Sequence, residues 1–380
     1  MRYKIETVSP AYIGDGNSYS ALDSIFADTF FYAINMDALF RRLQTLGKID
    51  EITADIESGS PLSETIKGII EPRDVAGYTI KLSEQNRKDR KYVREVHEFI
   101  KDANQGVYLP GSEIKGAIRT AILYRLLLDE ENYKRLKNAL INVKQRESRT
   151  IDDAKRGDRW AKKKLGRALG NVSKEVENLL RGKEDDAKHD LLRFIQIGDS
   201  STYNPNNLEI LHINSFGSRR GKHAYVEALP KGAKFNGSFN LTKNSWVLKE
   251  LGLDNREFLL SEGEVLKSCY VLSKNLIKNE IEYYEKHQEP QIVTFYQQLQ
   301  RENTEENPLI KIGQGQGFLS TTITLTVKIK KSDHELYEII RLGTWGKSYA
   351  YEFPKKRRLV FENGKPTYPL GWVKLELKNE

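Results

Sequence analysis

The segment Tyr108–Leu128, YLPGSEIKGAIRTAILYRLLL, carries the residues whose types and spacing best fit a chemical task. Pro110–Gly111 is a turn signal, and we expect Ser112 to cap a helix that starts directly after it. Lys115 and Arg119 lie four residues apart, so both side chains project from one side of that helix. Free backbone N–H groups at a helix N-terminus, with two cations beside them, are suited to binding a phosphate. The alternative is an ordinary amphipathic helix with a solvated lysine and arginine.

A second segment that could approach a ligand closely is the glycine-rich run Gly313–Gly317. Its glycines let the backbone lie against a ligand, a partner or an RNA strand, and Gln314 and Gln316 can add neutral hydrogen bonds. A dinucleotide-binding loop would have its glycines opening a helix, whereas the β-branched alternation of Thr321–Ile329 predicts a strand. We therefore expect no nucleotide site here. A purely structural turn is the alternative.

The sequence contains no set of residues with the spacing of an active site. The six histidines are scattered and form no HxH or HExxH metal pattern, and no Gly-x-Ser-x-Gly elbow occurs. Asp185 and Asp186 with His189 come nearest to a metal cluster, but solvated charges explain them better. Asp199 could serve as an acid, although an Asx turn at a strand end fits better. We expect no catalytic residue, no metal and no cofactor.

Basic residues gather in two further places. Between Lys155 and Arg167 there are seven basic residues against one acid, within a region, 129–190, where apolar residues are sparse. This region is predicted to be a helical insertion that lies on the surface and is not part of the core. It is either a solvated pair of charged helices or an arm that follows a phosphate backbone. Lys355–Arg358 is either a solvated run or a fixed basic loop.

Composition limits the class of protein. The 380 residues are sufficient for two domains, and the net charge of +8 favours a polyanionic partner, with nucleic acid ahead of an acidic membrane surface. A single cysteine excludes a disulfide framework and a cysteine zinc site. Because the sequence also shows no signal peptide and no long apolar run, we expect a cytoplasmic protein without membrane contact.

The elements that must position these residues can be read from periodicity. Alternating polar and apolar residues predict a half-buried strand at Tyr3–Val8, followed by the glycine-punctuated loop Ser9–Gly16. Further strands are predicted at 24–34, 92–100, 191–198, 208–214, 223–229, 233–241 and 372–377, helices at 37–46, 62–70, 112–128 and 257–285, and a solvated charged loop at 85–92. The two halves of the chain contain comparable sets of predicted strands and helices, which indicates two related α+β domains.

Four segments resemble a known family when they are taken in order. Pro110–Arg119, PGSEIKGAIR, resembles the PGS-x-x-KG-x-x-R segment of the RAMP superfamily of CRISPR proteins. Thr7–Gly16, TVSPAYIGDG, resembles the start of one branch, the fifth subunits of type III-A (Csm) effector complexes. Gly313–Thr321, GQGQGFLST, resembles the glycine-rich loop of that branch. The C-terminal segments FPKKRRLV and YPLGWVKLEL resemble its ending.

The resemblance implies a fold and a function. The implied fold is α+β, with two fused ferredoxin-like (RRM-like) domains at 1–128 and 191–380, the second carrying the glycine-rich loop, and the basic helical insertion at 129–190 between them. The implied function is a non-catalytic subunit that binds CRISPR RNA, caps the effector complex at the 3′ end of that RNA and supports its maturation and antiviral defence. The implied partners are CRISPR RNA and the other Csm subunits, with host nucleases left open.

The resemblance also assigns candidate RNA-binding residues in both loops and at the helix start. These are Gly14, Gly16, Ser112, Lys115, Arg119, Gly313, Gln314, Gly315, Gln316, Gly317 and Phe318. Charge alone adds Lys355, Lys356, Arg357 and Arg358. The sequence departs from the family pattern at Tyr12, where histidine is common, and at Glu113, where a small residue is usual. Glu113 places an anion beside the proposed phosphate site, or favours the helix dipole itself.

Two alternatives to an RNA-binding cap remain open. One is a metal-independent endoribonuclease, because some relatives cut CRISPR repeats with histidine or tyrosine as acid and base. Only Tyr12 and Tyr19 lie near the first glycine loop, and no histidine precedes His97. The other alternative is a pure protein–protein cap, in which the basic charge is incidental.

Overall fold

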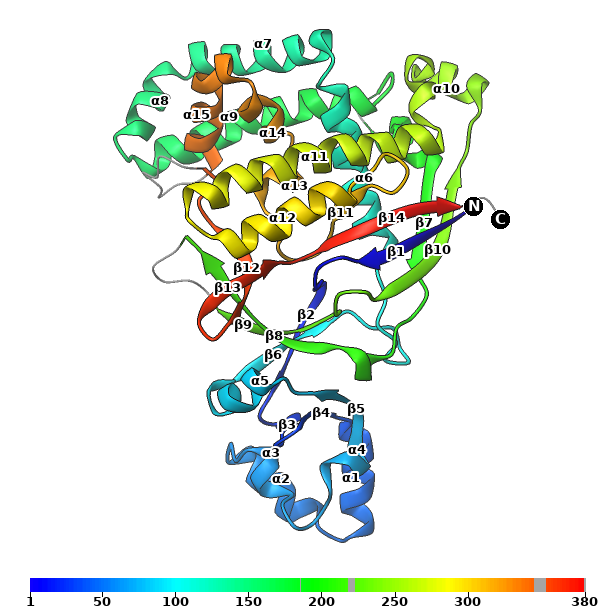
Figure 1. The fold of residues 1–380 in the computed structure, drawn as a ribbon, viewed down its shortest axis with the longest axis vertical. Helices are drawn as coiled ribbons and strands as arrows, with labels where there is room; N and C mark the ends of the chain where they lie inside the picture. Colours follow the sequence, from blue (N-terminus) through cyan, green and yellow to red (C-terminus); the bar gives the residue numbers. More distant parts are fainter. Residues whose placement is uncertain (185, 218–222, 345–352, 379–380) are drawn as a thin grey trace.

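The computed structural model describes residues 1–184, 186–217, 223–344 and 353–378. Within these ranges, five antiparallel strands form the sheet around which the molecule is built, in the order β11-β14-β1-β10-β7 (Figure 1). Its strands are β1 (Arg2–Thr7), β7 (Ile195–Ser200), β10 (Lys234–Leu241), β11 (Leu309–Lys311) and β14 (Trp372–Lys378). β1 alternates exposed and buried residues, as predicted for a half-buried strand. The first and last strands of the chain, β1 and β14, are direct neighbours, with Tyr3 opposite Leu377.

Two helices complete the topology of this sheet. Helix α6 (Gly111–Leu126) comes between β1 and β7, and helix α11 (Glu262–Lys286) comes between β10 and β14. The β-α-β-β-α-β order, with the fourth strand beside the first and the third beside the second, is the ferredoxin-like arrangement. The predicted α+β fold with ferredoxin-like topology is confirmed. Because β1 comes from the start of the chain and the other four strands come from residues 195–378, this unit draws on both 1–128 and 191–380, and the domain boundaries stay a prediction.

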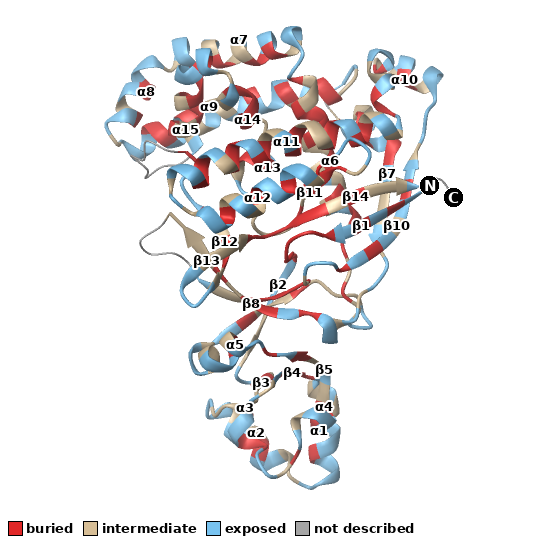
Figure 2. Cartoon of the chain, viewed as in Figure 1, coloured by how far each residue is buried: buried red, intermediate tan, exposed pale blue. Residues whose placement is uncertain are grey.

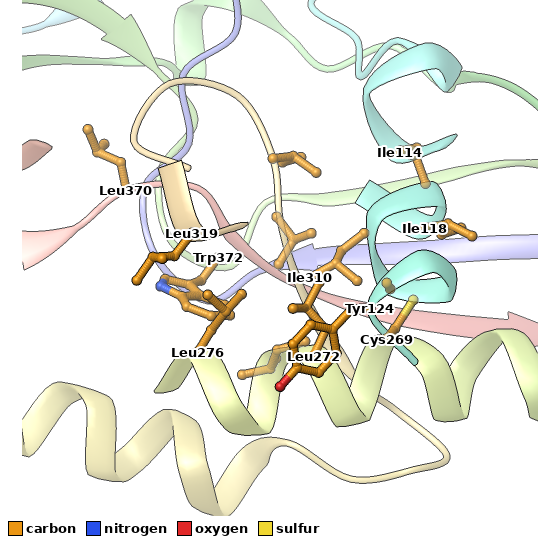
Figure 3. Close-up of a cluster of buried hydrophobic side chains, with 14 of the residues drawn as sticks. Ile114, Ile118, Tyr124, Cys269, Leu272, Leu276, Ile310, Leu319, Leu370 and Trp372 are labelled. Atoms are coloured by element: carbon orange, nitrogen blue, oxygen red, sulfur yellow. The ribbon is translucent and has the colours of Figure 1, made fainter. Parts of the chain in front are cut away.

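The main core lies where the two helices cover the sheet. Figure 3 shows Ile114 and Ile118 of α6, Leu272 and Leu276 of α11 and Trp372 of β14 in one buried cluster. Isoleucine at helical spacing on α6 gives the apolar stripe that the sequence predicts, and this stripe faces the sheet. Burial of these side chains fixes α6 on the sheet and so fixes where its N-terminus lies.

A second sheet has six strands in the order β13-β12-β8-β9-β6-β2 among the described residues. They are β2 (Gly14–Ser20), β6 (Glu95–Phe99), β8 (Glu209–Phe216), β9 (Ala224–Ala228), β12 (Arg357–Glu362) and β13 (Lys365–Pro369). β6 and β9 run parallel and the other neighbours run antiparallel. These strands are inserted between those of the first sheet, so the two sheets share the whole length of the chain.

A small lobe lies at one end of the molecule, below the two sheets in Figure 1. It contains strands β3 (Ser24–Phe26), β4 (Phe30–Ile34) and β5 (Ala76–Lys81) and helices α1 (Met36–Thr45), α2 (Ile49–Glu57), α3 (Leu62–Thr65) and α4 (Pro72–Val75). Leu39, Leu43 and Ile52 belong to a core of its own, separate from the main one. The Tyr78 hydroxyl donates to the buried carboxylate of Glu227 and thereby joins the lobe to β9.

The predicted basic insertion 129–190 is helical, with α7 (Glu130–Arg146), α8 (Ser148–Lys155) and α9 (Arg159–Glu177). It is not excluded from the core, however, because Leu140, Leu165 and Val172 join the main buried cluster. Figure 2 shows these helices with buried faces inward and exposed faces outward. The remaining helices are α5 (Glu84–Asp89), α10 (Ser245–Leu251), α12 (Pro290–Glu302), α13 (Phe318–Thr321), α14 (Thr324–Ile329) and α15 (His334–Thr344). In the described ranges, no helix combines the length and apolarity needed to span a membrane.

Two further local predictions were wrong. Thr321–Ile329 is not a strand, because α13 ends and α14 begins within it. Its threonines are compatible with helix since their hydroxyls donate to preceding carbonyls, as Thr326 does to Ile323 at 2.6 Å. The charged run 85–92 is not a solvated loop but contains α5, where the buried amide of Asn86 donates to the carbonyl of Ile210 at 2.6 Å.

Candidate nucleic-acid interface

The N-terminus of α6 is capped from another strand. The backbone N–H of Gly111 donates to the carboxylate of Asp199 in β7 at 2.8 Å. A side chain at Gly111 would meet the carbonyl of Ile197 at 2.3 Å, so only glycine allows this approach. Pro110 holds the N-cap position, and the predicted capping role of Ser112 is wrong. Ser112 is exposed, so its hydroxyl is free for an outside partner, although Asp199 already supplies an anion at this helix end.

The two cations of the helix start are not equivalent. Arg119 donates to the carboxylate of Asp190 at 2.7 Å, and both side chains are largely buried. Within the described residues Lys115 makes no ion pair, and its side chain is half-buried. Lys115 is therefore the cation of this pair that can meet a phosphate without losing an internal partner.

Three segments that are far apart in the sequence meet at the glycine-rich loop. The carboxylate of Glu113 in α6 accepts from the backbone N–H of Gly313 at 3.1 Å. The carbonyl of Tyr12, in the first loop, accepts from the backbone N–H of Gln314 at 2.7 Å. Gly313 has φ +65°, and a Cβ there would lie 2.3 Å from the carbonyl of Tyr12. The structure thus brings the first loop, the start of α6 and the glycine-rich loop together as one surface, which we call the motif surface.

Within the glycine-rich loop, the side chains differ in what they can offer. The amide of Gln316 donates back to the carbonyl of Lys311 at 2.8 Å, so it shapes the loop. The carbonyl oxygen of the Gln314 side chain is buried without a hydrogen-bond partner among the described residues. Phe318 is half-buried, with its ring centroid 5.1 Å from that of Phe353. Gly317 is the exposed glycine of the run and leads into α13.

The glycines of the first loop lie in strand β2. A Cβ on Gly14 would lie 2.2 Å from the Tyr12 hydroxyl, so Gly14 allows the tyrosine ring to lie against the backbone. Gly16 has φ +100° with open space around it, and it sits where the register of β2 against β6 shifts. Both glycines are exposed and available to a partner.

The basic run Lys355–Arg358 is divided by burial. Lys355 and Lys356 are exposed, but Arg357 is buried and donates to the carboxylate of Glu280 in α11 at 2.7 Å. Burial works against the charge of Arg357, yet Glu280 outweighs this and raises the arginine pKa. The reading of the run as fully solvated is therefore wrong for Arg357. Its outward charge comes from the two lysines, beside a half-buried Arg358.

The structure adds Lys311, which the sequence did not single out, and it corrects the expectation that only tyrosines lie near the first glycine loop. Lys311 ends strand β11 just before the glycine-rich loop, its ammonium lies 5.4 Å from the centre of the Trp372 ring, and burial lowers its pKa to about 8. His97 in β6 lies directly opposite Ser18 in β2. Strand pairing across 79 residues brings this histidine near the first glycine loop, and no local pattern could have shown it.

Neither tyrosine near the first loop is suited to act as a base at neutral pH. Burial, reinforced by Asp15, Glu227 and Glu98, raises the pKa of Tyr12 to about 12. Burial also raises the pKa of Tyr19. A base must lose its proton near the working pH, and these phenols hold theirs.

The one cluster of metal-binding residue types in the described ranges is formed by Glu184, Asp186 and His189. Asp185 lies outside the described residues. The ring of His189 and the carboxylate of Asp186 are 2.7 Å apart, and Asp186 also accepts from the backbone of Lys188. These contacts satisfy the carboxylate locally, so the cluster is explained by a capped turn.

A ferredoxin-like sheet, with a P-G-S helix start and a glycine-rich loop held against it, defines the class of this protein. The chain belongs to the RAMP superfamily, whose family model matches residues 4–345. Within the superfamily it is similar to the CRISPR system Cms protein Csm5 of Methanocaldococcus jannaschii, with 26% identity over 413 residues that cover 99% of this chain and 89% of that protein. The protein of the same name from Streptococcus thermophilus is 23% identical over 291 residues, covering 69% and 72%.

Solved structures share the fold over almost the full chain. A chain in the cryo-EM structure of a Csm-crRNA-target RNA ternary complex of a type III-A CRISPR-Cas system matches with a TM-score of 0.71 and 24% identity, covering 99% of this chain and 100% of that one. The crystal structure of T. onnurineus Csm5 matches with a TM-score of 0.68 and 22% identity, covering 97% and 99%. The family predicted from four short motifs is confirmed.

Proposed function

We propose that this chain is a CRISPR RNA-binding subunit that caps a type III-A effector complex at the 3′ end of the guide RNA and supports guide maturation and antiviral defence. The observation that carries the proposal is the match, over 99% of this chain, to a complete chain of a Csm-crRNA-target RNA complex. The four family motifs support the 3′ position. Its partners are CRISPR RNA and the other subunits of the complex, and its compartment is the cytoplasm.

The motif surface supports RNA contact by charge and by close approach. Lys115 lacks an internal ion pair within the described residues, and the exposed Lys356 lines a pocket together with Gln316 and Gly317 of the glycine-rich loop. Lysine contacts to phosphate position an RNA strand but carry no base information. Binding is therefore independent of guide sequence, as a subunit that serves many guides requires, and it weakens steeply as salt rises.

The same surface supports a non-catalytic role. The phenol of Tyr12 keeps its proton at neutral pH, and the ring nitrogen of His97 is 3.7 Å from the carboxylate of Glu95 on its own strand. General acid–base cleavage needs two groups that exchange protons near neutral pH within reach of one phosphate. The ionisable contact that the structure gives His97 is thus a carboxylate of its own strand, and the phenol nearest to the first loop keeps its proton.

Co-expression of the complex subunits with and without this chain tests the proposal. Sequencing of the guide RNA in the purified complexes reads both of its ends. We expect the 5′ end to be unchanged and the 3′ end to become heterogeneous or longer when this chain is left out. Identical 3′ ends in the two preparations would contradict the proposal.

Incubation of the purified chain with a repeat RNA separates binding from cleavage. On a native gel we expect the RNA to migrate more slowly because it is bound, and on a denaturing gel we expect it to be intact. Cleavage that is lost in His97→Ala and retained in a His334→Ala control would instead favour the endoribonuclease.

A further inference from the structure

An exposed stripe of one aromatic and several basic side chains follows helix α9. Trp160, Lys163, Arg167 and Lys174 are spaced by three, four and seven residues, so they share one face of the helix. All four are exposed, and Trp160 retains 78% of its accessible surface. The opposite face of α9 is buried in the main core, so the stripe is fixed in position on a rigid element.

The stripe borders an open groove of about 460 Å³ between α8 and the start of α9. Two acids also line this groove, but both have partners in the fold. Asp158 caps α9 by accepting from the backbone of Ala161 at 2.8 Å, and Asp153 pairs with Arg156.

The cations of the stripe are largely unpaired. Lys164, which also lines the groove, pairs with Glu147 at 2.9 Å, but Lys163 and Arg167 make no ion pair within the described ranges. Two cations without an ion pair on a fixed helix face attract an anion without first breaking an internal salt bridge.

The aromatic ring narrows the class of partner. Lys163 holds its ammonium 5.6 Å from the centre of the Trp160 ring, and most of the ring remains open to solvent. A protein interface has an apolar centre of several side chains, whereas Trp160 is the one large apolar side chain among the residues that line this groove. An aromatic ring among cations is the combination that binds single-stranded nucleic acid, with bases stacked on the ring and phosphates on the cations.

The position of α9 connects the stripe to the motif surface. Gly166 and Leu169 of α9 line a cavity of about 300 Å³ together with Phe318, the residue that follows the glycine-rich loop. The same helix therefore lines a cavity beside Phe318 with some of its residues and carries the stripe with others.

We propose that the α9 stripe is a second binding site for single-stranded RNA, with a base stacked on Trp160 and phosphates bound by Lys163 and Arg167. The proposal rests on the proposed function in that both require RNA as the partner, but it concerns a different surface. The site is independent of base sequence, because both stacking and phosphate contacts accept any nucleotide.

Binding of a fluorescein-labelled oligouridine to the full chain, followed by fluorescence anisotropy, tests this site. Trp160→Ala is compared with Trp246→Ala, since Trp246 in α10 is 71% exposed and lies outside the stripe. We expect Trp160→Ala to raise the Kd about fivefold or more, because base stacking is worth about 1–3 kcal/mol. Trp160→Phe should restore most of the affinity, and Trp246→Ala should leave it unchanged.

Charge removal gives a second readout. Lys163→Gln with Arg167→Gln should reduce the slope of log affinity against log salt by about 1.4, which corresponds to two phosphates on a single strand.

If Trp160→Ala binds like Trp246→Ala while Lys115→Ala is weakened, the stripe is not an RNA site and the proposed function stands. If Trp160→Ala binds RNA normally but is lost from the assembled complex, the stripe is a protein contact and the inference is overturned. If the unaltered chain binds no RNA, the proposed function fails as well.

Discussion

The carboxylate of Glu113 accepts a hydrogen bond from the backbone N–H of Gly313 at 3.1 Å and so joins helix α6 to the glycine-rich loop across 200 residues of sequence. Glu113 is also one of the two positions that depart from the family pattern. As an isolated anion beside a phosphate site it would oppose RNA binding, but in the structure it positions the loop that forms the motif surface. Its partner is a backbone N–H, so a neutral amide oxygen at this position can accept the bond as well, although more weakly than a carboxylate.

Substitutions at Glu113 separate positioning from charge. Glu113→Gln keeps an acceptor oxygen and removes the anion, so we expect RNA affinity to be equal or higher. Glu113→Ala removes the acceptor and should lower the free energy of unfolding by about 1 kcal/mol and weaken RNA binding several-fold. Urea unfolding and anisotropy measure the two effects. Equal RNA affinity in the two variants would show that this bond does not position the loop.

Gly313 tests the close approach of the loop to Tyr12. Gly313→Ala must accommodate φ +65° and a Cβ 2.3 Å from the carbonyl of Tyr12. Gly47→Ala is the matched control, with φ +66° and no atom within 4 Å. The backbone conformation should lower the free energy of unfolding of both variants by about 1 kcal/mol, and the close contact should lower that of Gly313→Ala by about 1–3 kcal/mol more. Equal losses by thermal unfolding would mean that the loop is free to move away from Tyr12.

The sequence could predict helix α6 but not what caps it. The isoleucines at helical spacing are a local pattern, and they define the buried face correctly. The cap comes from Asp199, 88 residues away from Gly111, so only the fold shows it. In the same way, the motifs could be found one by one, while their convergence depends on tertiary contacts such as that between Tyr12 and Gln314.

Lys115 and Arg119 should respond differently to substitution. Lys115→Ala should leave the melting temperature unchanged and reduce the salt slope of RNA binding by about 0.7, the value for one phosphate. Arg119→Ala breaks the ion pair with Asp190, so it should cost roughly 1 kcal/mol of stability. Asp190→Asn should reproduce that loss, and the double variant should add little to it. A salt slope that falls in Arg119→Ala and not in Lys115→Ala would contradict this assignment.

Within the basic run 355–358, substitution of the buried arginine should affect stability, whereas substitution of the exposed lysines should affect RNA binding. Arg357→Ala leaves the buried carboxylate of Glu280 without its cation and should cost about 3–5 kcal/mol. Lys355→Ala with Lys356→Ala touches two exposed side chains and should leave stability unchanged while it weakens RNA binding. Chemical denaturation of both variants checks the contrast. A stable Arg357→Ala chain would show that this pair is not needed for the fold.

The stability of the protein should rise with pH through the titration of Lys311. Its pKa is lowered to about 8 in the folded chain, first by burial, against an ordinary value of 10.5. Between these values the unfolded chain binds a proton that the folded chain does not, so unfolding becomes less favourable as pH rises. Lys311→Met should therefore be more stable than the unaltered chain at pH 7.5, with a smaller advantage at pH 9.5. Urea denaturation at both pH values measures this, and a constant difference would contradict it.

The strand predicted at Thr321–Ile329 shows where β propensity alone gives the wrong element. Alternating β-branched residues favour strands when nothing else acts on them. Here Leu325 and Val327 are buried, and threonine hydroxyls donate to the carbonyls of the preceding turn. Packing and these bonds outweigh propensity, which is a weak prior in a folded chain. The small lobe was missed for a related reason, because its separate core appears only when β3, β4 and β5 are paired.

Photocrosslinking from the 3′ end of the guide RNA tests the central claim most directly. A reconstituted type III-A complex would carry 4-thiouridine in the last nucleotides of the guide, and mass spectrometry would identify the crosslinked peptides. We predict crosslinks to this chain within 112–119 and 313–318, reduced in Glu113→Ala and retained in Glu113→Gln. Crosslinks from the 3′ end to other subunits alone, with none to this chain, would contradict the account.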